Sequence, residues 1–366
     1  MVNFLHIRYY HWSFILLLVR QYFKNQNELL VIVCPRALGP TLLSLGLHHK
    51  EDFIFEAEVN SYVNSHQISE VNFILHHNEY SVSKFSEQFS EHLANVTTKS
   101  VSFYLDGYTN KAFYEKETEQ VLKQKSDFFL KNVISFGMQV ALPNHLDSAT
   151  QIVIKGNLIN EVRDQSNIKK IVSPLLEKMT LTEGKHIVLL AMRPWGSSSF
   201  HGGQFYFSDG AAVFSKMLEK IIENIRKEIS PSSVDVLLKV DSRELDYCNQ
   251  VLAKINTDSV CALKFPEFWP AWLNLDFFIM YAKEHFKSNF SLVTLDSSAG
   301  LPFLHSDYID YQLIGVPDDA LDLLVDCAAK RQIIAKSKLI VSDTLARVNV
   351  DDKKSSGSSF LVYRGT

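Results

Sequence analysis

Short apolar runs alternate along the chain with longer stretches in which apolar residues recur at helical spacing. In the first half this pattern predicts strands at residues 2–8, 28–34, 71–76 and 100–105, and helices at 10–24, 81–94 and 111–125. Such alternation is typical of parallel strands joined by crossover helices, as in a doubly wound α/β sheet. Residues 131–164 show no clear period and contain the breakers Pro143 and Gly156, so we expect a connecting region there.

After a helix predicted near residues 169–179, a second series of the same kind begins. It predicts strands at 186–192, 234–240, 260–265, 291–295, 311–314 and 339–341, and helices at 210–228, 243–255, 277–286 and 318–329. Two successive series of similar size indicate two Rossmann-like domains, at 1–165 and 166–350, followed by a polar tail at 351–366. In such sheets ligands bind beyond the carboxyl ends of the strands, so polar residues at strand ends are the candidates for a site.

Composition narrows the class of protein. The chain of 366 residues is 46% hydrophobic and 21% charged, and its formal net charge of -4 argues against a nucleic-acid partner. Residues 14–19 are apolar, but the run is far shorter than the ~20 residues that span a bilayer, and Arg20 closes it. We therefore expect a buried helix there, without a signal peptide, in a cytoplasmic protein.

The four cysteines are widely spaced, with no metal-binding or disulfide pattern. We expect them to be small core residues in a reducing compartment. They are Cys34, Cys248, Cys261 and Cys327.

In the N-terminal domain, Asp106 and Gly107 follow the strand predicted at 100–105. Glycine allows a sharp turn, and the carboxylate can then point into a cleft and accept a proton from a hydroxyl group as a general base. An ordinary Asp-Gly turn, in which the aspartate binds its own backbone, explains the same pattern.

In the C-terminal domain, Arg193, Ser197, Ser198 and His201 lie in the segment that follows the strand predicted at 186–192. Small hydroxyl residues and glycines in such a segment can present backbone N–H groups to a phosphate, and an arginine adds a charged contact. A surface loop has the same composition, so both interpretations stay open.

Two further strand ends in this domain carry polar groups. Lys239, Asp241 and Arg243 lie at the end of the strand predicted at 234–240, where they form either an anion site or a solvated helix start. The pair Ser297 and Ser298 follows the strand predicted at 291–295. Serines at a helix start cap the helix and also favour a bound phosphate.

Several catalytic classes lack their motifs. The sequence contains no DxD motif, no Walker loop, no HExxH and no GxSxG. The adjacent pairs His48-His49 and His76-His77 would face opposite sides of a strand, so we expect surface or half-buried residues and not a metal site.

Taken in order, the strand ends resemble those of the bacterial sialyltransferases of the GT-B fold. Asp106 and Gly107 are similar to the end of that family's acidic-acidic-Gly motif, and Ser297 and Ser298 to its Ser-Ser motif. The segment with Ser197 and Ser198 is similar to the loop that opens the family's second domain. The resemblance implies two Rossmann-like domains facing each other across a cleft, an N-terminal acceptor domain and a C-terminal donor domain.

Two positions depart from the family pattern. Leu105 stands where a second acid is usual, and Asp241 stands where the family has the histidine of its His-Pro motif. Since that histidine assists the departing phosphate, Lys239, Arg243 or His201 would have to neutralise the leaving group here. The departures make a transferase of pseudaminic or legionaminic acid as well matched as a sialyltransferase.

The resemblance implies an inverting reaction that needs neither a metal nor another cofactor. Asp106 would act as the base, and the partners would be a CMP-activated nonulosonic acid and a hydroxyl of a cell-surface glycan. It also implies contact with the cytoplasmic face of the inner membrane. The alternatives are a GT-B transferase using a UDP- or GDP-sugar, and a catalytically degenerate partner protein of the same fold.

Overall fold

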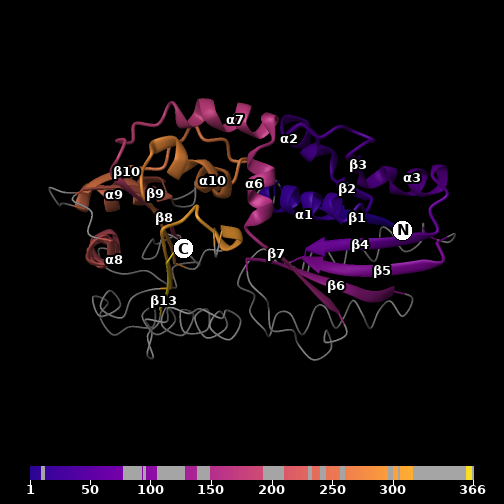
Figure 1. Cartoon of the computed structure of the whole chain (residues 1–366). Coiled ribbons are helices and arrows are strands. Elements are labelled where there is room, and N and C mark those ends of the chain that lie inside the picture. Colours follow the sequence, from indigo (N-terminus) through magenta and orange to yellow (C-terminus); the bar gives the residue numbers. More distant parts are fainter. Residues whose placement is uncertain are drawn as a thin grey trace. The chain divides into compact units, whose positions relative to one another are not determined.

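The computed structural model divides the chain into two compact units. It describes residues 1–9, 13–76, 93, 96–104, 128–137, 149–192, 210–229, 233–239, 245–255, 260–295, 300–303, 306–315 and 360–364. Unit 1 is Met1–Pro174 with Trp269–Phe277, and unit 2 is Leu175–Phe268 with Phe278–Thr366. Each unit contains its own β-sheet (Figure 1).

Unit 1 is built on a seven-stranded sheet in which every described pairing is parallel. Its strands are β1 (Val2–His6), β2 (Leu30–Cys34), β3 (Phe53–Phe55), β4 (Glu70–His76), β5 (Thr98–Tyr104), β6 (Phe128–Phe136) and β7 (Thr150–Ile154). The spatial order is β3-β2-β1-β4-β5-β6-β7. The direction of winding therefore reverses between β1 and β4, as in a Rossmann fold.

Helices pack against this sheet and complete the core of unit 1. They are α1 (Ser13–Asn25), α2 (Gly39–Ser44), α3 (Val59–Ser65) and α6 (Asn157–Arg163), with short 3₁₀ turns η2 (Arg36–Leu38) and η3 (Glu56–Glu58). The helix α7 (Ser166–Leu176) begins in unit 1, and its last two residues belong to unit 2. Val59 and Val63 of α3 share an apolar cluster with Phe4 and Phe73 of the sheet. In α1 every residue from Ser13 to Val19 is buried. The predicted buried helix is therefore confirmed, since this apolar run belongs to the core.

Unit 2 is built on a six-stranded sheet. Its strands are β8 (His186–Met192), β9 (Val234–Lys239), β10 (Val260–Lys264), β11 (Phe290–Leu295), β12 (Tyr311–Gly315) and β13 (Phe360–Arg364). In the order β10-β9-β8-β11-β12-β13, only β13 runs antiparallel to its neighbour. The winding reverses between β8 and β11, so the second Rossmann-like sheet has its own switch point.

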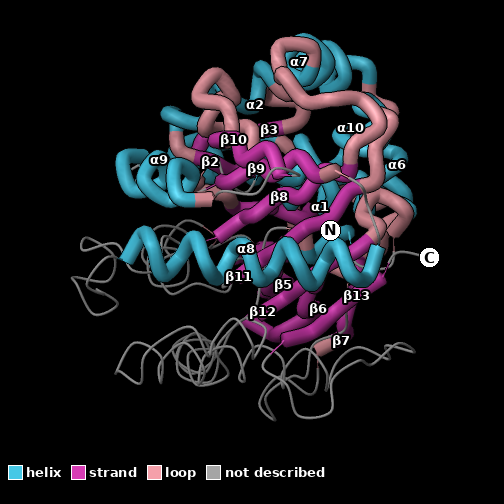
Figure 2. Tube along the Cα trace, turned by 90° about the vertical axis from the view of Figure 1, so that its left-hand side faces the viewer, coloured by secondary structure: helices cyan, strands magenta, loops and turns pink. Residues whose placement is uncertain are grey.

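The helices described in unit 2 are α8 (Gly210–Ile229), α9 (Leu245–Lys254) and α10 (Leu275–Phe286), with the 3₁₀ turn η7 (Leu301–Phe303). The right-handed rule for crossovers between parallel strands predicts α8 and α9 on one face of this sheet and α10 on the other. Figure 2 shows α8 as one long, unbroken helix. The predicted α/β fold with two Rossmann-like domains is confirmed, although β3, β6, β7 and β13 were not predicted as strands.

The prediction of a connecting region at residues 131–164 is wrong. This segment contributes β7, α6 and most of β6. Lys131, Asn132 and Ser135 interrupt the apolar pattern of β6, and β7 is an edge strand with a short apolar run. The predicted helices at 81–94, 111–125 and 318–329 and the strand at 339–341 lie outside the described residues.

Candidate functional site

At the carboxyl end of the unit 1 sheet, the ends of β1 and β3 meet in a group of charged side chains. Nε2 of His6 lies 2.7 Å from Oε1 of Glu56, and Nε of Arg8 lies 3.8 Å from the same oxygen. The side chains of His6, Arg8 and Glu56 are 2%, 10% and 18% exposed. A carboxylate shared by an imidazole and a guanidinium in so dry a place is held in one orientation, because each partner restricts its rotation.

The neighbouring strands β4 and β5 end in two polar aromatic residues, His76 and Tyr104. The rings of His76 and Tyr104 are 5.1 Å apart, with an angle of 61° between their planes. The Tyr104 hydroxyl donates to the carbonyl oxygen of His6 over 3.4 Å, so the pair adjoins the first group. The expectation that His76 is a surface or half-buried residue is wrong, because β4 lies between β1 and β5 and both of its faces are covered.

We name His6, Arg8, Glu56, His76 and Tyr104 the carboxyl-edge group. It lies at and beside the β1/β4 reversal, where open α/β sheets bind their ligands. Imidazole, carboxylate and phenol are all proton-transfer groups, so this arrangement suits acid–base chemistry on a bound hydroxyl. Asp106 follows the last residue of β5 by two positions but, like Gly107, lies outside the described residues.

The sequence contained a usable signal for part of this group. His6 and His76 are each the last residue of a buried strand, and Glu56 follows the apolar β3 directly. A polar residue at the end of an apolar strand is therefore the signal that marks His6 and His76. β3 has only three residues, which hides Glu56 from pattern analysis.

Cys34 lies at the end of β2 but is unsuited to be a nucleophile. Burial raises the pKa of its thiol to about 12, and the carboxylates of Glu56 and Glu58 add to this effect. The thiol therefore stays protonated near neutral pH.

The other described cysteines differ in exposure. Cys248 in α9 is buried, and burial raises the pKa of its thiol to about 11, although Lys264 and Lys239 act in the opposite direction. Cys261 is exposed on the edge strand β10, so the prediction that it is a core residue is wrong. Cys327 lies outside the described residues.

In unit 2, Lys239 is the predicted donor-site residue that the structure describes. It ends β9, and its Nζ atom lies 6.0 Å from the centroid of the Phe265 ring, just beyond the end of β10. A partly exposed cation at a carboxyl strand end can attract a phosphate. The remaining predicted residues lie outside the described part of the chain: Arg193, Ser197, Ser198, His201, Asp241, Arg243, Ser297 and Ser298.

Gly300 is the first described residue after the segment that contains Ser297 and Ser298. Its φ of +79° is a left-handed conformation, which favours glycine. A Cβ atom built there would lie 2.0 Å from Cδ2 of Leu292 and 3.4 Å from Nε2 of Gln312. The backbone therefore packs directly against Leu292 of β11 and Gln312 of β12.

The aromatic segment after β10 mainly covers the core. Phe265 and Trp269 are buried, and the Trp269 indole N–H donates to the carbonyl oxygen of Leu273 over 2.6 Å. The Trp272 carbonyl accepts a hydrogen bond from Ser13 over 3.0 Å. Phe265 and Trp269 of this segment are therefore core residues.

Buried titratable residues at the amino end of the unit 2 sheet serve the fold. The Asp235 carboxylate accepts hydrogen bonds from the Thr182 backbone N–H and from Lys185, over 2.9 and 3.2 Å. Nε2 of His186 lies 2.7 Å from Oγ of Ser291. Because ligands bind at the other end of such strands, these contacts stabilise the sheet.

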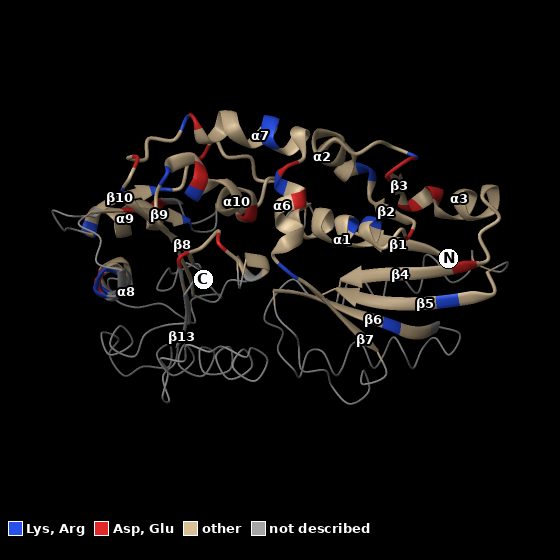
Figure 3. Cartoon of the chain, viewed as in Figure 1, with Lys and Arg blue, Asp and Glu red and all other residues tan. Residues whose placement is uncertain are grey.

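Figure 3 shows basic and acidic residues interspersed along the described parts of both units. Among the described residues, no cluster of three or more His, Cys, Asp or Glu side chains is placed to hold a metal ion. None of the described helices is long and apolar enough to cross a membrane.

No protein-family model matches the sequence, and no curated protein matches it significantly. Solved structures with a similar arrangement include a sialyltransferase from Photobacterium damsela, with 11% identity, a TM-score of 0.44, and coverage of 93% of this chain and 80% of that one. They also include a putative UDP-N-acetylglucosamine 2-epimerase from Listeria monocytogenes, with 11% identity, a TM-score of 0.42, and coverage of 94% and 89%. A third is the UDP-GlcNAc 2-epimerase from Neisseria meningitidis bound to UDP-GlcNAc, with 12% identity, a TM-score of 0.37, and coverage of 94% and 93%. The fold assignment rests on the strand order of the two sheets.

Proposed function

We propose that the protein is an inverting, metal-independent glycosyltransferase. It moves a nonulosonic acid (sialic, pseudaminic or legionaminic acid) from a CMP donor to a hydroxyl of a cell-surface glycan, at the cytoplasmic face of the inner membrane. The observation that carries this proposal is the carboxyl-edge group, which gathers proton-transfer side chains at the switch point of a Rossmann-like sheet. Asp106, two residues beyond β5, continues the same edge in the sequence.

In the proposed reaction Asp106 takes the proton of the acceptor hydroxyl. The acceptor oxygen bonds to the anomeric carbon while the bond from that carbon to the phosphate oxygen breaks, and CMP leaves with the electron pair. Negative charge therefore grows on the phosphate, and stabilising that charge is the main catalytic task.

Ser297 and Ser298 are proposed to donate to the phosphate, with Lys239 and Arg243 supplying positive charge. Lys239 supports this assignment because it ends a strand at the carboxyl side of unit 2. Arg193, Ser197 and Ser198 are proposed to line the donor, and His201 is the candidate to replace the histidine absent at Asp241.

A thermal-shift screen of the full chain against CMP, CTP, UDP and GDP tests the donor class. A ligand at 100 times its Kd adds about 2.7 kcal/mol to the free energy of unfolding, which raises Tm by several degrees. We expect CMP and CTP to stabilise the protein and UDP and GDP to leave it unchanged. Stabilisation by UDP or GDP alone would favour the other donor class. Binding of CMP without turnover of CMP-sugar to CMP would favour a degenerate partner protein.

A further inference from the structure

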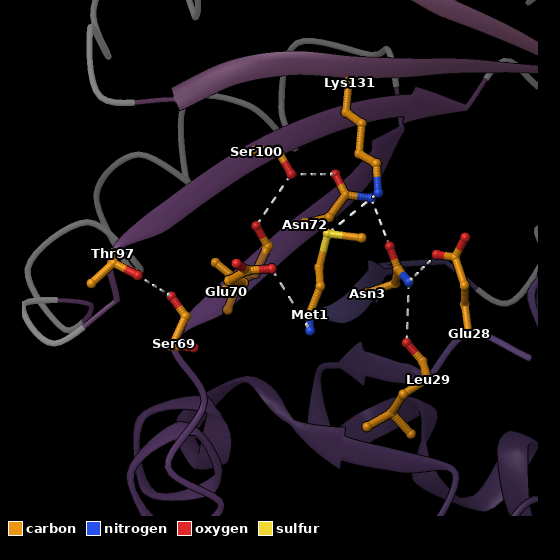
Figure 4. A network of polar contacts seen from close by, with 11 residues as sticks. Met1, Asn3, Glu28, Leu29, Ser69, Glu70, Asn72, Thr97, Ser100 and Lys131 are labelled. Atoms are coloured by element: carbon orange, nitrogen blue, oxygen red, sulfur yellow. Dashed lines mark hydrogen bonds and ion pairs between the residues drawn. The ribbon is translucent and has the colours of Figure 1, made fainter.

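A row of buried polar side chains crosses the centre of the unit 1 sheet (Figure 4). Nδ2 of Asn72 in β4 donates to Oδ1 of Asn3 in β1 over 2.8 Å. Oδ1 of Asn72 accepts hydrogen bonds from the hydroxyls of Ser100 and Ser102 in β5, over 3.1 and 3.0 Å. We name these four residues the polar ladder.

The ladder specifies how three strands align. All four side chains are fully buried, and a buried polar group is tolerated only when it is hydrogen-bonded. Asn3 also donates to Glu28 and to the carbonyl oxygen of Leu29, over 3.0 and 3.2 Å (Figure 4). A shift of one residue would turn these side chains to the opposite face and leave their partners unpaired.

The alignment of β5 depends on this ladder because β5 pairs regularly with β4 on one side but irregularly with β6 on the other. Its pairing with β4 is regular as far as His76 opposite Tyr104. Its pairing with β6 is irregular between Val101 and Phe103, because β6 carries one extra residue between their partners Leu130 and Val133. Ser102 is the residue between Val101 and Phe103, and its bond to Asn72 ties β5 to β4 at the point where the β6 side is irregular. A bulge bends the strand that carries the extra residue, here β6, so β5 has no regular partner on that side and its alignment depends on β4.

Successive side chains of a strand alternate between faces, so Ser100, Ser102 and Tyr104 lie on one face of β5. Ser102 is the last ladder residue before Tyr104 and comes four positions before Asp106. We propose that Ser102, through Asn72, is a positioning residue: it sets the direction in which β5 delivers Tyr104 against His76, and the chain continues from Tyr104 to the proposed base Asp106. The part of this inference that concerns catalysis rests on the proposed function.

Ser102→Ala and Ser100→Ala make a matched pair for testing this role in the full chain. Both remove one hydroxyl bond to the same Asn72 oxygen at nearly the same length, but only Ser102 lies at the irregular pairing with β6. We expect both variants to lower Tm by about 2–4 °C, because Ser102 loses its buried hydrogen bond to Asn72 and Ser100 loses one that its hydroxyl shares between Asn72 and the carbonyl oxygen of Val71. In Ser102→Ala alone, we expect the His76 ring resonance, assigned in histidine-labelled protein with a His76→Asn variant, to move.

Turnover of CMP-sugar supplies the second measurement. Misplacing a catalytic group by about an ångström reduces turnover roughly 10- to 100-fold, so Ser102→Ala should show such a loss in kcat with the donor KM unchanged. Ser100→Ala should keep kcat within about twofold of wild type. Equal effects of the two variants on the His76 resonance would overturn the positioning role. A wild-type chain that does not turn over CMP-sugar would overturn the proposed function, while the His76 resonance still decides the structural part.

Discussion

The hydrogen bond between Nε2 of His6 and Oε1 of Glu56, 2.7 Å long, joins the carboxyl ends of β1 and β3. β2 lies between these strands in the sheet, so the bond bridges across it. Arg8 approaches the same carboxylate oxygen. The Glu56 carboxylate therefore holds the side chains of His6 and Arg8 together beside the point where the winding of the sheet reverses.

Removing the negative charge of Glu56 should destabilise unit 1. In Glu56→Gln, His6 and Arg8 lose a charged partner in a nearly dry environment, and we expect the free energy of unfolding to fall by about 1–3 kcal/mol. Urea denaturation at neutral pH measures this. Glu51→Gln, at an exposed position, should change stability by less than about 0.5 kcal/mol. Equal losses in both variants would show that the contact contributes nothing specific.

Asp106→Ala tests the proposed base. We expect turnover of CMP-sugar with acceptor to fall by ~10²–10⁴, the usual contribution of a positioned acid–base group, with Tm little changed. Asp246→Ala is the control, since Asp246 is exposed in the first turn of α9. Near-normal turnover in Asp106→Ala removes this residue from the mechanism.

Replacing Ser297 and Ser298 together with alanine should mainly weaken donor binding. Hydrogen bonds to a charged phosphate contribute about 1.5–3 kcal/mol each, so the loss of two should lower the CMP affinity measured by calorimetry at least about 100-fold. Ser61→Ala, an exposed serine in α3, should leave the affinity unchanged. An unaltered CMP affinity in the double variant would refute the phosphate assignment.

Gly300 and Gly184 provide a matched comparison of backbone strain with and without crowding. Both have left-handed φ values, +79° and +81°, but only at Gly300 would a Cβ atom meet a neighbour. We expect Gly184→Ala to lower the free energy of unfolding by about 1 kcal/mol. Gly300→Ala should lower it by about 2–4 kcal/mol, because Leu292 is buried and must also shift. Similar losses in urea denaturation would mean that the Leu292 side chain adjusts freely.

His186 should make the stability of the protein fall in mild acid. Burial lowers the pKa of its imidazole to about 4, although Asp310 acts in the opposite direction. The unfolded chain binds this proton near pH 6.5, so its contribution to stability is complete above that pH. It is lost progressively as the pH falls from about 6.5 towards about 4, by up to about 3 kcal/mol.

Urea denaturation between pH 7.5 and 4.5 tests this dependence. His186→Gln removes the titrating group and should flatten the profile, whereas His285→Gln, at an exposed position, should keep the wild-type slope. A wild-type slope in His186→Gln would assign the acid sensitivity to other groups.

The sequence by itself determined the class of fold. Runs such as β2, β4 and β8 are long, apolar and separated by helical stretches, so local composition was sufficient to predict them. The apolar run of α1 was likewise recognisable as part of a core helix, because it is too short to span a bilayer. Where polar residues interrupt a strand, as in β6, or where a strand has three residues, as in β3, local pattern failed.

Only the tertiary structure decided which strand ends meet. His6 and Glu56 are separated by 50 positions and His6 and Tyr104 by 98, and nothing local in the sequence pairs them. Their proximity follows from the strand order, in which β1 lies next to β4 and β3 is the edge strand two positions from β1. The irregular pairing between β5 and β6 and the ladder beside it are equally non-local, because register depends on partners that come from other parts of the chain.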